Sequence, residues 1–147
     1  MHNITDKEVP TTDLSIRVSY GETDQMKMVY YANYLIYFER GRTEWLRQHG
    51  FCYKDMEAQG LYLPVIDCSC KYLAPAHYDD VLIVRTRLAE RGAASLTFSY
   101  EITCNGCLLV RGSTRHPIVD TTFKPIRFPA ELRKIFDEAY EKENTDC

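Results

Sequence analysis

Residues 30–49, YYANYLIYFERGRTEWLRQH, decide the fold, because this proline-free segment carries apolar residues at near-helical spacing. Gly50 follows directly, in the position where a glycine commonly ends a helix. The segment therefore predicts one long central helix whose apolar side chains are Tyr34, Tyr37, Phe38, Trp45 and Leu46.

Strand patterns lie on both sides of this helix. Residues 14–20 alternate between apolar and polar, which predicts a half-buried strand ending at Tyr20. A short helical turn is expected over residues 54–59. Alternation then returns in residues 61–72, 80–90, 95–104 and 107–120, with breaks at Pro75, Arg91-Gly92 and Asn105-Gly106, and a last helix starts at Pro129.

One strand, one long helix and four consecutive antiparallel strands make an α+β order, in which the helix must cover the apolar face of the sheet. A chain of 147 residues with 45% hydrophobic content fits a single domain, residues 1–147. We expect flexible ends at residues 1–12 and 141–147, because the polar tail EKENTDC continues no apolar stripe.

Composition excludes several classes of protein. The N-terminus has no basic start followed by an apolar run, and no stretch of about eighteen apolar residues occurs, so we expect a soluble cytoplasmic protein without membrane insertion. A formal net charge of −3 argues against a broad nucleic-acid surface.

The six cysteines do not form a metal-binding pattern. Cys104 and Cys107 match half a zinc site, but no second half follows and His116 has no histidine at ligand spacing, so we expect no metal. The intervening Asn-Gly predicts a two-residue hairpin that places these two cysteines opposite each other. Cys68 and Cys70 share one strand face and are expected to be buried thiols.

Asp24 is the strongest candidate for chemistry. It lies in TDQMKMVYYANY, residues 23–34, where a loop leads into the start of the central helix. Free backbone N–H groups at a helix N-terminus can polarise a carbonyl, and a carboxylate facing them suits acyl transfer. The alternative is structural, with Asp24 capping the helix or closing a turn.

The chain resembles the hotdog-fold acyl-CoA thioesterases of the 4-hydroxybenzoyl-CoA thioesterase and YbgC type. The similarity extends over about residues 16–120, with the order and spacing of its motifs preserved. It is carried by RVSY and ETD in residues 17–24, VYYANY in residues 29–34, FER and RTEWL in residues 38–46, YLAPAHYDD in residues 72–80, and GSTRH in residues 112–116.

The resemblance implies a curved antiparallel sheet wrapped around the central helix. It also implies a homodimer or a homotetramer built as a dimer of dimers, with sites at the subunit interface. The substrate would be an acyl-CoA, whose coenzyme A moiety is part of the substrate, and no cofactor is expected. Asp24 would be the nucleophile or general base, and Tyr31 would polarise the thioester oxygen through its backbone N–H.

Two positions depart from the common pattern of the family. Tyr31 replaces a histidine, which moves the similarity toward the 4-hydroxybenzoyl type. Lys27 replaces a glycine, and its side chain would either project into solvent or touch a ligand phosphate. Tyr30 is expected to join Tyr31 in the acyl pocket.

The remaining candidates have structural alternatives. Tyr34, Tyr37 and Phe38 could line the pocket, but aromatic residues at helical spacing favour the core. His116 is expected to be a structural histidine. The charged residues of the central helix are expected to pair along its face; they are Glu39, Arg40, Arg42 and Glu44.

Coenzyme A carries phosphates, which guanidinium groups bind well. Arg85, Arg87 and Arg91 form the best basic cluster for them, the alternative being a solvated strand edge; Arg111 and Arg115 are weaker candidates. Two competing functions stay open at this point. One is a thioesterase acting on acyl-carrier protein, and the other is a scaffold that binds acyl-CoA without catalysis.

Overall fold

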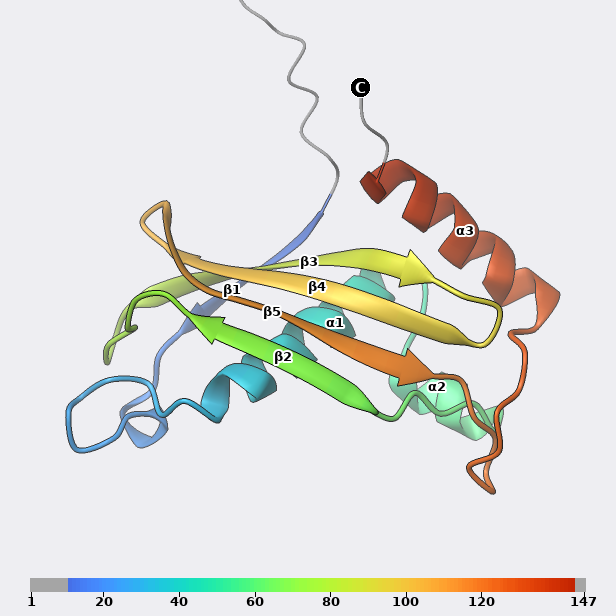
Figure 1. Cartoon of the computed structure of the whole chain (residues 1–147), viewed down its shortest axis with the longest axis horizontal. Coiled ribbons are helices and arrows are strands. Elements are labelled where there is room, and N and C mark those ends of the chain that lie inside the picture. The colour runs from blue at the N-terminus through green and yellow to red at the C-terminus, as the bar shows by residue number, and fades with distance from the viewer. Residues whose placement is uncertain (1–10, 145–147) are drawn as a thin grey trace, which may run out of the picture.

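The computed structural model describes residues 11–144, and the rest of the chain lies outside the described residues. The helices and strands follow the order expected from the sequence (Figure 1). No helix within the described residues is long and apolar enough to cross a membrane. The elements are β1 (Thr12–Arg17), a 3-10 turn η1 (Tyr20–Glu22), α1 (Asn33–Gln48), α2 (Tyr53–Ala58), β2 (Asp67–Tyr72), β3 (Val81–Arg91), β4 (Ser95–Cys104), β5 (Cys107–Pro117) and α3 (Ala130–Asn144).

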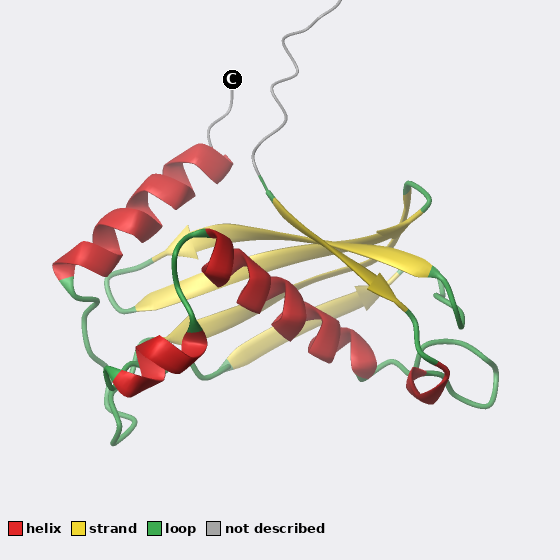
Figure 2. Ribbon diagram, turned by 180° about the vertical axis from the view of Figure 1, so that it is seen from behind, coloured by secondary structure: helices red, strands yellow, loops and turns green. Residues whose placement is uncertain are grey.

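The strands form one antiparallel five-stranded sheet in the order β1-β3-β4-β5-β2. Helix α1 lies across one face of this sheet, as Figure 2 shows, and α3 lies beside the end of β3. The expected hotdog arrangement is therefore confirmed. We call the face turned away from α1 the outer face of the sheet.

Alternation along the strands places large side chains between the sheet and α1. On β3 and β4 every second residue is buried, and these residues meet the apolar face of α1. The Phe38 ring stacks on Tyr100 with centroids 4.4 Å apart. Tyr34, Tyr37 and Phe38 are almost fully buried, so the prediction that they belong to the core is confirmed.

Two glycines allow α1 to approach the sheet this closely. A Cβ on Gly112 of β5 would lie 2.5 Å from the Phe38 ring and 2.5 Å from the Ser69 carbonyl oxygen. A Cβ on Gly41 of α1 would lie 2.5 Å from Thr86 Oγ1. Both positions therefore need a residue without a side chain, because the neighbouring atoms already fill that volume.

The expected pairing of charges along α1 is wrong for Arg42. This side chain is 7% exposed, and it donates from Nε to Tyr53 Oη at 2.8 Å and from Nη1 to Tyr100 Oη at 3.2 Å. The face of α1 that carries Arg42 is turned toward the sheet. Its guanidinium group therefore donates to phenol oxygens rather than to carboxylates. Glu44 does follow the expected pattern, since it pairs with Arg47 one turn along the helix.

A chain of hydrogen bonds extends from Arg42 through the core. Arg42 Nη1 donates to Tyr100 Oη. The Leu63 carbonyl can only accept, so the neutral His116 ring carries its proton on Nδ1, its Nε2 accepts from Thr114 at 2.7 Å, and Thr114 Oγ1 accepts from the Tyr100 hydroxyl at 2.6 Å. His116 Nδ1 then donates to the Leu63 carbonyl at 3.1 Å. Burial lowers the pKa of His116 to about 4, which keeps the ring neutral, and the prediction of a structural histidine is confirmed.

The cysteine predictions have mixed outcomes. Asn105 and Gly106 both have positive φ, 52° and 80°, and place Cys104 opposite Cys107, as expected for the hairpin. Cys68 is exposed, so its predicted burial is wrong. The reason is that β2 is an edge strand whose residues are largely exposed.

Element ends differ from the predicted ends. β1 ends at Arg17 rather than Tyr20, and α1 begins at Asn33 rather than near residue 30. Of the ends expected to be flexible, Thr12 is a buried residue of β1, and α3 continues through residues 141–144. Residues 1–10 and 145–147 of that prediction lie outside the described residues.

The last turn of α3 is ordered because two of its side chains bind β3. The Leu88 amide donates to Glu143 Oε1 at 2.7 Å, and Asn144 Nδ2 donates to the Leu88 carbonyl at 2.8 Å. Among the described residues β1 pairs with β3 only as far as Thr86, so these side chains occupy the edge beyond that point. Glu143 also accepts from Trp45 Nε1 at 2.8 Å.

Glu143 should make stability depend on pH. Burial raises the pKa of its carboxyl from 4.5 to about 7, even though Leu88 and Trp45 donate to it and His49 Nε2 lies 3.7 Å away. The folded state favours the protonated, neutral carboxyl. The contribution of Glu143 to the free energy of unfolding is therefore fully present below about pH 4.5 and is lost as the pH rises through 7. Relative to Glu143→Gln, the wild-type free energy of unfolding should fall by on the order of 2–4 kcal/mol from pH 4.5 to 8. Urea titrations at each pH measure the free energy of unfolding.

The exposed residue Glu138 provides the matched control. The free energy of unfolding of Glu138→Gln should change with pH in parallel with that of the wild type. A Glu143→Gln protein whose free energy of unfolding also changes in parallel with the wild type would contradict the prediction.

Gly112→Ala should destabilise the protein by about 1–3 kcal/mol, because the new methyl group displaces Phe38 or the β2 backbone. The free energy of unfolding in urea measures the effect. Gly21→Ala is the matched control, since a Cβ there meets nothing within 4 Å. It should change stability by less than about 0.5 kcal/mol. Equal changes in both variants would contradict the close-approach argument.

Candidate active site

A hollow of about 500 Å³ lies where α1 begins, beside the end of β2. Its wall is mainly apolar and aromatic, and Asp24 is the one acidic residue that residues 11–144 contribute to it. The lining residues are Asp24, Met26, Met28, Val29, Tyr31, Tyr34, Tyr72, Leu73, Ala74 and Pro75. Two residues singled out in the sequence, Asp24 and Tyr31, are thus brought together.

A tight turn orients Asp24. Its backbone N–H donates to the Met28 carbonyl at 2.8 Å, and the Lys27 amide donates to the Asp24 carbonyl at 2.9 Å. The carboxylate oxygen Oδ1 accepts from the Met26 amide at 2.8 Å. Asp24 therefore closes the turn, as the structural alternative proposed. Oδ2 has no hydrogen-bond partner among the described residues, which leaves it available to a ligand.

Lys27 has a left-handed backbone in this turn, with φ of 64°. This conformation costs a residue with a side chain about 1–2 kcal/mol and costs glycine little, which gives a physical reason for the glycine common at this position. The lysine side chain is exposed. Its presence therefore strains the turn without placing the side chain in the hollow.

The start of α1 is tied to η1. Tyr30 N donates to the Glu22 carbonyl at 2.9 Å, and Asn33 donates from Nδ2 to the same oxygen at 2.8 Å. Asn33 N donates to the Tyr30 carbonyl at 2.8 Å. No described residue accepts a hydrogen bond from the amide of Tyr31 or Ala32. These N–H groups lie at the N-terminus of the helix and can donate hydrogen bonds to an anionic atom of a ligand.

The two adjacent tyrosines differ in position. Their rings lie 4.7 Å apart, and Tyr31 lines the hollow while Tyr30 does not. A hydrogen bond with the Tyr31 side chain raises the pKa of Tyr30. Both rings are substantially exposed.

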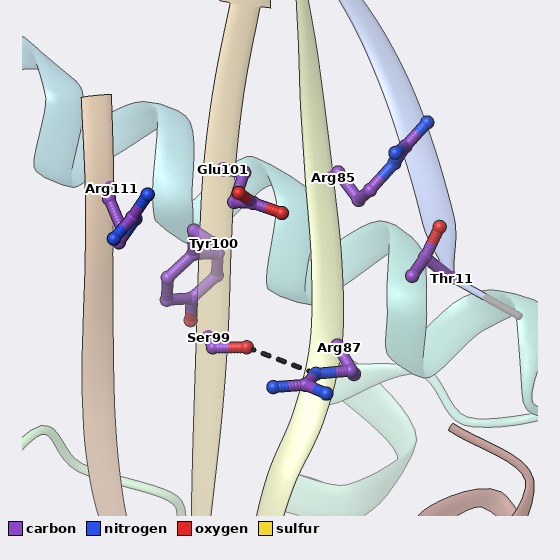
Figure 3. A pocket seen from close by; sticks show the side chains of 7 residues that line it. All are labelled: Thr11, Arg85, Arg87, Ser99, Tyr100, Glu101 and Arg111. Atoms are coloured by element: carbon purple, nitrogen blue, oxygen red, sulfur yellow. Dashed lines mark hydrogen bonds between the residues drawn. The ribbon is translucent and has the colours of Figure 1, made fainter. Parts of the chain in front are cut away.

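The arginines predicted to bind phosphate do not form a single cluster. Figure 3 shows Arg85 and Arg87 on β3 and Arg111 on β5, with Ser99 and Glu101 of β4 between them. These residues line a hollow of about 470 Å³ on the outer face. Arg85 is paired with Asp13 at 3.0 Å, and Arg87 donates to Ser99 Oγ at 3.4 Å.

Arg91 lies apart from this hollow, where it forms an ion pair with Asp137 of α3. Among the described residues, the Asp24 hollow and the outer-face hollow share no lining residue, and no lysine or arginine lines the Asp24 hollow. Within residues 11–144, no three His, Cys, Asp or Glu side chains gather in a way that could hold a metal ion.

Sequence reasoning missed the β2 side of the Asp24 hollow. Tyr72 donates from its hydroxyl to the Tyr31 carbonyl at 2.9 Å, although 41 residues separate them. Tyr72 and Leu73 belong to the segment YLAPAHYDD, which carried part of the family resemblance. That segment was the available signal, but no periodicity within it indicated contact with α1.

Comparison with known proteins places the chain among thioesterases. Residues 18–136 match the Thioesterase-like superfamily. The putative acyl-CoA thioesterase YneP of Bacillus subtilis is 40% identical over 132 residues, which cover 86% of this chain and 93% of that protein. The acyl-CoA thioesterase YbgC of Haemophilus influenzae is 35% identical, covering 82% of this chain and 90% of the relative.

Solved structures share the fold. A DHNA-CoA thioesterase from Staphylococcus aureus superposes with a TM-score of 0.84 at 31% identity, covering 87% of this chain and 89% of that chain. A hypothetical protein from Thermus thermophilus also has a TM-score of 0.84, at 34% identity, with 87% and 98% covered.

Proposed function

The chain belongs to the thioesterase-like superfamily, and on that premise we propose that it is an acyl-CoA thioesterase, which hydrolyses an acyl-CoA to a free acid and coenzyme A. One observation carries the proposal. The Asp24 carboxylate, with Oδ2 unoccupied by any described partner, and the start of α1, with the Tyr31 amide equally available, line the same hollow.

The chemistry divides between these two groups. The Tyr31 N–H stabilises the negative charge that develops on the thioester oxygen. Asp24 either attacks the carbonyl carbon, forming an anhydride as the thiolate leaves, or removes a proton from the water that attacks it. Water cleaves the anhydride in the first route, and both routes end with a carboxylic acid and a thiol.

The lining of the hollow favours an uncharged acyl group. Met26, Met28 and Val29 form one side of it, and Leu73 and Pro75 lie on the β2 side. A second anionic group would find no cation among the described residues of the lining and would approach Asp24. We therefore propose aliphatic or aromatic acyl groups without an added carboxylate.

We also propose that two subunits join through β2. Among the described residues this strand pairs on one side only, with β5, so its other edge can add a strand from a second copy. Apolar residues exposed along the same segment support the pairing: Val65, Ile66, Tyr72 and Leu73. The product is a homodimer, or a homotetramer built from two such dimers.

Arg85 and Arg87 are proposed to bind the phosphates of coenzyme A, together with Arg111. Their support is that the three guanidinium groups line one hollow of about 470 Å³. Arg91 is left out of this proposal because it does not line that hollow and forms an ion pair with Asp137 of α3 instead.

Asp24→Asn should lower kcat by roughly 10²–10⁴, because an amide is neither a base nor an effective nucleophile. Asparagine keeps an oxygen that can accept from the Met26 amide, so folding should be retained. Steady-state hydrolysis with a thiol-trapping dye measures the loss, over a panel of aliphatic and aromatic acyl-CoAs. Exposed Asp55→Asn is the matched control and should retain full activity.

Single-turnover hydrolysis in ¹⁸O water separates the two routes. If Asp24 attacks and water then cleaves the anhydride at the Asp24 carbonyl, the first acid released carries no label, because its new oxygen comes from Asp24. General-base catalysis instead puts one labelled oxygen into the acid in the first turnover. Normal turnover by a folded Asp24→Asn protein would contradict both routes, whereas a wild-type protein that binds acyl-CoA without any turnover would favour an acyl-CoA-binding scaffold.

Arg87→Ala should raise KM for acyl-CoA roughly tenfold with little change in kcat, because its contact is with phosphate rather than the reacting carbonyl. An acyl-pantetheine thioester lacks the nucleotide phosphates and should be hydrolysed equally well by variant and wild type. Arg91→Ala is the control and should leave both KM values unchanged. Equal losses on the two substrates would assign Arg87 a structural role instead.

Ile66→Glu should weaken self-association, because it places a charge on the exposed apolar segment next to the β2 edge. Light scattering over a dilution series should give a dimer or tetramer for the wild type and a smaller species for the variant. Val81→Glu, a similar change at an exposed residue of β3, should keep the wild-type mass. A wild-type monomer that stays fully active at high dilution would refute the shared interface.

A further inference from the structure

We propose that Tyr72 is a positioning residue for thioester hydrolysis, which it serves by holding the peptide group next to the Tyr31 amide. The inference rests on the proposed function. Its geometric basis is the 2.9 Å hydrogen bond from the Tyr72 hydroxyl to the Tyr31 carbonyl, which joins β2 to the first residues before α1. Tyr72 also lines the Asp24 hollow.

The Tyr31 carbonyl is available to Tyr72 because the helix does not use it. α1 begins at Asn33, and the Leu35 amide donates to the Ala32 carbonyl at 3.2 Å, in a tighter turn than the α-helical one. An ordinary helix would instead direct the Leu35 amide to the carbonyl four residues earlier, at Tyr31. The Tyr72 hydroxyl thus donates to the Tyr31 carbonyl in place of the Leu35 amide.

Two anchors then determine the direction of the Tyr31 amide. The first peptide group consists of the Tyr30 carbonyl and the Tyr31 N–H. It is held by the Asn33 amide, which donates to the Tyr30 carbonyl oxygen at 2.8 Å. The next peptide group, which contains the Tyr31 carbonyl and the Ala32 N–H, is held by Tyr72. Peptide groups are planar, so fixing both of them fixes the rotation about the Tyr31 backbone that lies between them.

Packing makes Tyr72 a firm support for this peptide. Its ring lies against Tyr34 with centroids 5.4 Å apart and an interplanar angle of 62°. Tyr34 is 3% exposed, and its own hydroxyl accepts from the Ala76 amide at 3.3 Å. The ring of Tyr72 is therefore positioned by its contact with the buried Tyr34 and by its place at the end of β2.

Without this hydrogen bond the Tyr31 amide would sample more directions. Stabilisation of an oxyanion depends on donors that are already aimed at the developing charge, so a looser amide reduces the rate more than it reduces binding. Tyr72 itself is assigned no contact with the thioester and no part in proton transfer.

The test is Tyr72→Phe, which removes the hydroxyl and keeps the ring that packs on Tyr34. We expect kcat on an acyl-CoA to fall roughly tenfold, with KM changed less than about twofold and the melting temperature lowered by no more than a few degrees. Tyr78→Phe is the matched control, because Tyr78 is exposed and, among the described residues, the one aromatic ring it packs against is that of Tyr20. It should match the wild type.

A second substrate separates positioning from a structural role. In the corresponding acyl dithio-CoA a sulfur replaces the carbonyl oxygen, and sulfur accepts hydrogen bonds weakly, so the amide contributes less to its hydrolysis. The loss caused by Tyr72→Phe should shrink to less than about threefold on this substrate. Equal losses on both substrates, no loss on either, or an unfolded variant would overturn the inference. Wild-type protein inactive on every thioester would instead refute the proposed function.

Discussion

The approach of α1 to the sheet is the contact on which the rest of the structure depends. Gly41 on the helix and Gly112 on β5 have no side chain of their own, so the two layers approach closely at these points, and the Phe38 ring fills the space at Gly112 and stacks on Tyr100. Because α1 is fixed at its middle, its first turn comes to lie beside the end of β2. The hollow that contains Asp24 and the hydrogen bond between Tyr72 and Tyr31 both follow from that placement.

Buried polar groups hold the remaining elements in position. Arg42 begins a directed set of hydrogen bonds through Tyr100 and Thr114 to a neutral His116, which in turn binds the segment before β2. At the opposite edge, Glu143 joins α3 to Trp45 and to β3. Each of these groups would be costly to bury alone, so their partners specify how the elements meet.

The candidate site uses few chemical groups because its backbone is already arranged. One carboxylate oxygen of Asp24 accepts a hydrogen bond that closes the turn, and the other has no partner among the described residues. The start of the helix supplies backbone N–H donors, so no side chain is needed for that role. On the proposed mechanism, a tyrosine can replace the histidine that the family resemblance leads us to expect. The amide rather than the side chain of residue 31 is proposed to act on the carbonyl.

Much of this protein could be predicted from its sequence. Alternation located the strands, the apolar spacing of residues 30–49 located α1, and Asn105-Gly106 located the β4–β5 hairpin, because each is a property of neighbouring residues in one element. The order of elements also placed Asp24 just before the helix. Periodicity says which residues share a face, and that was sufficient for these features.

Only the tertiary structure decided which faces meet. It buried Arg42 among phenol oxygens, left Cys68 exposed on an edge strand, and separated Arg91 from Arg85 and Arg87. It also brought Tyr72 to the Tyr31 carbonyl across 41 residues of chain. Such contacts join elements that are distant in sequence, and their energies depend on packing and burial in three dimensions, so no local pattern of residues encodes them.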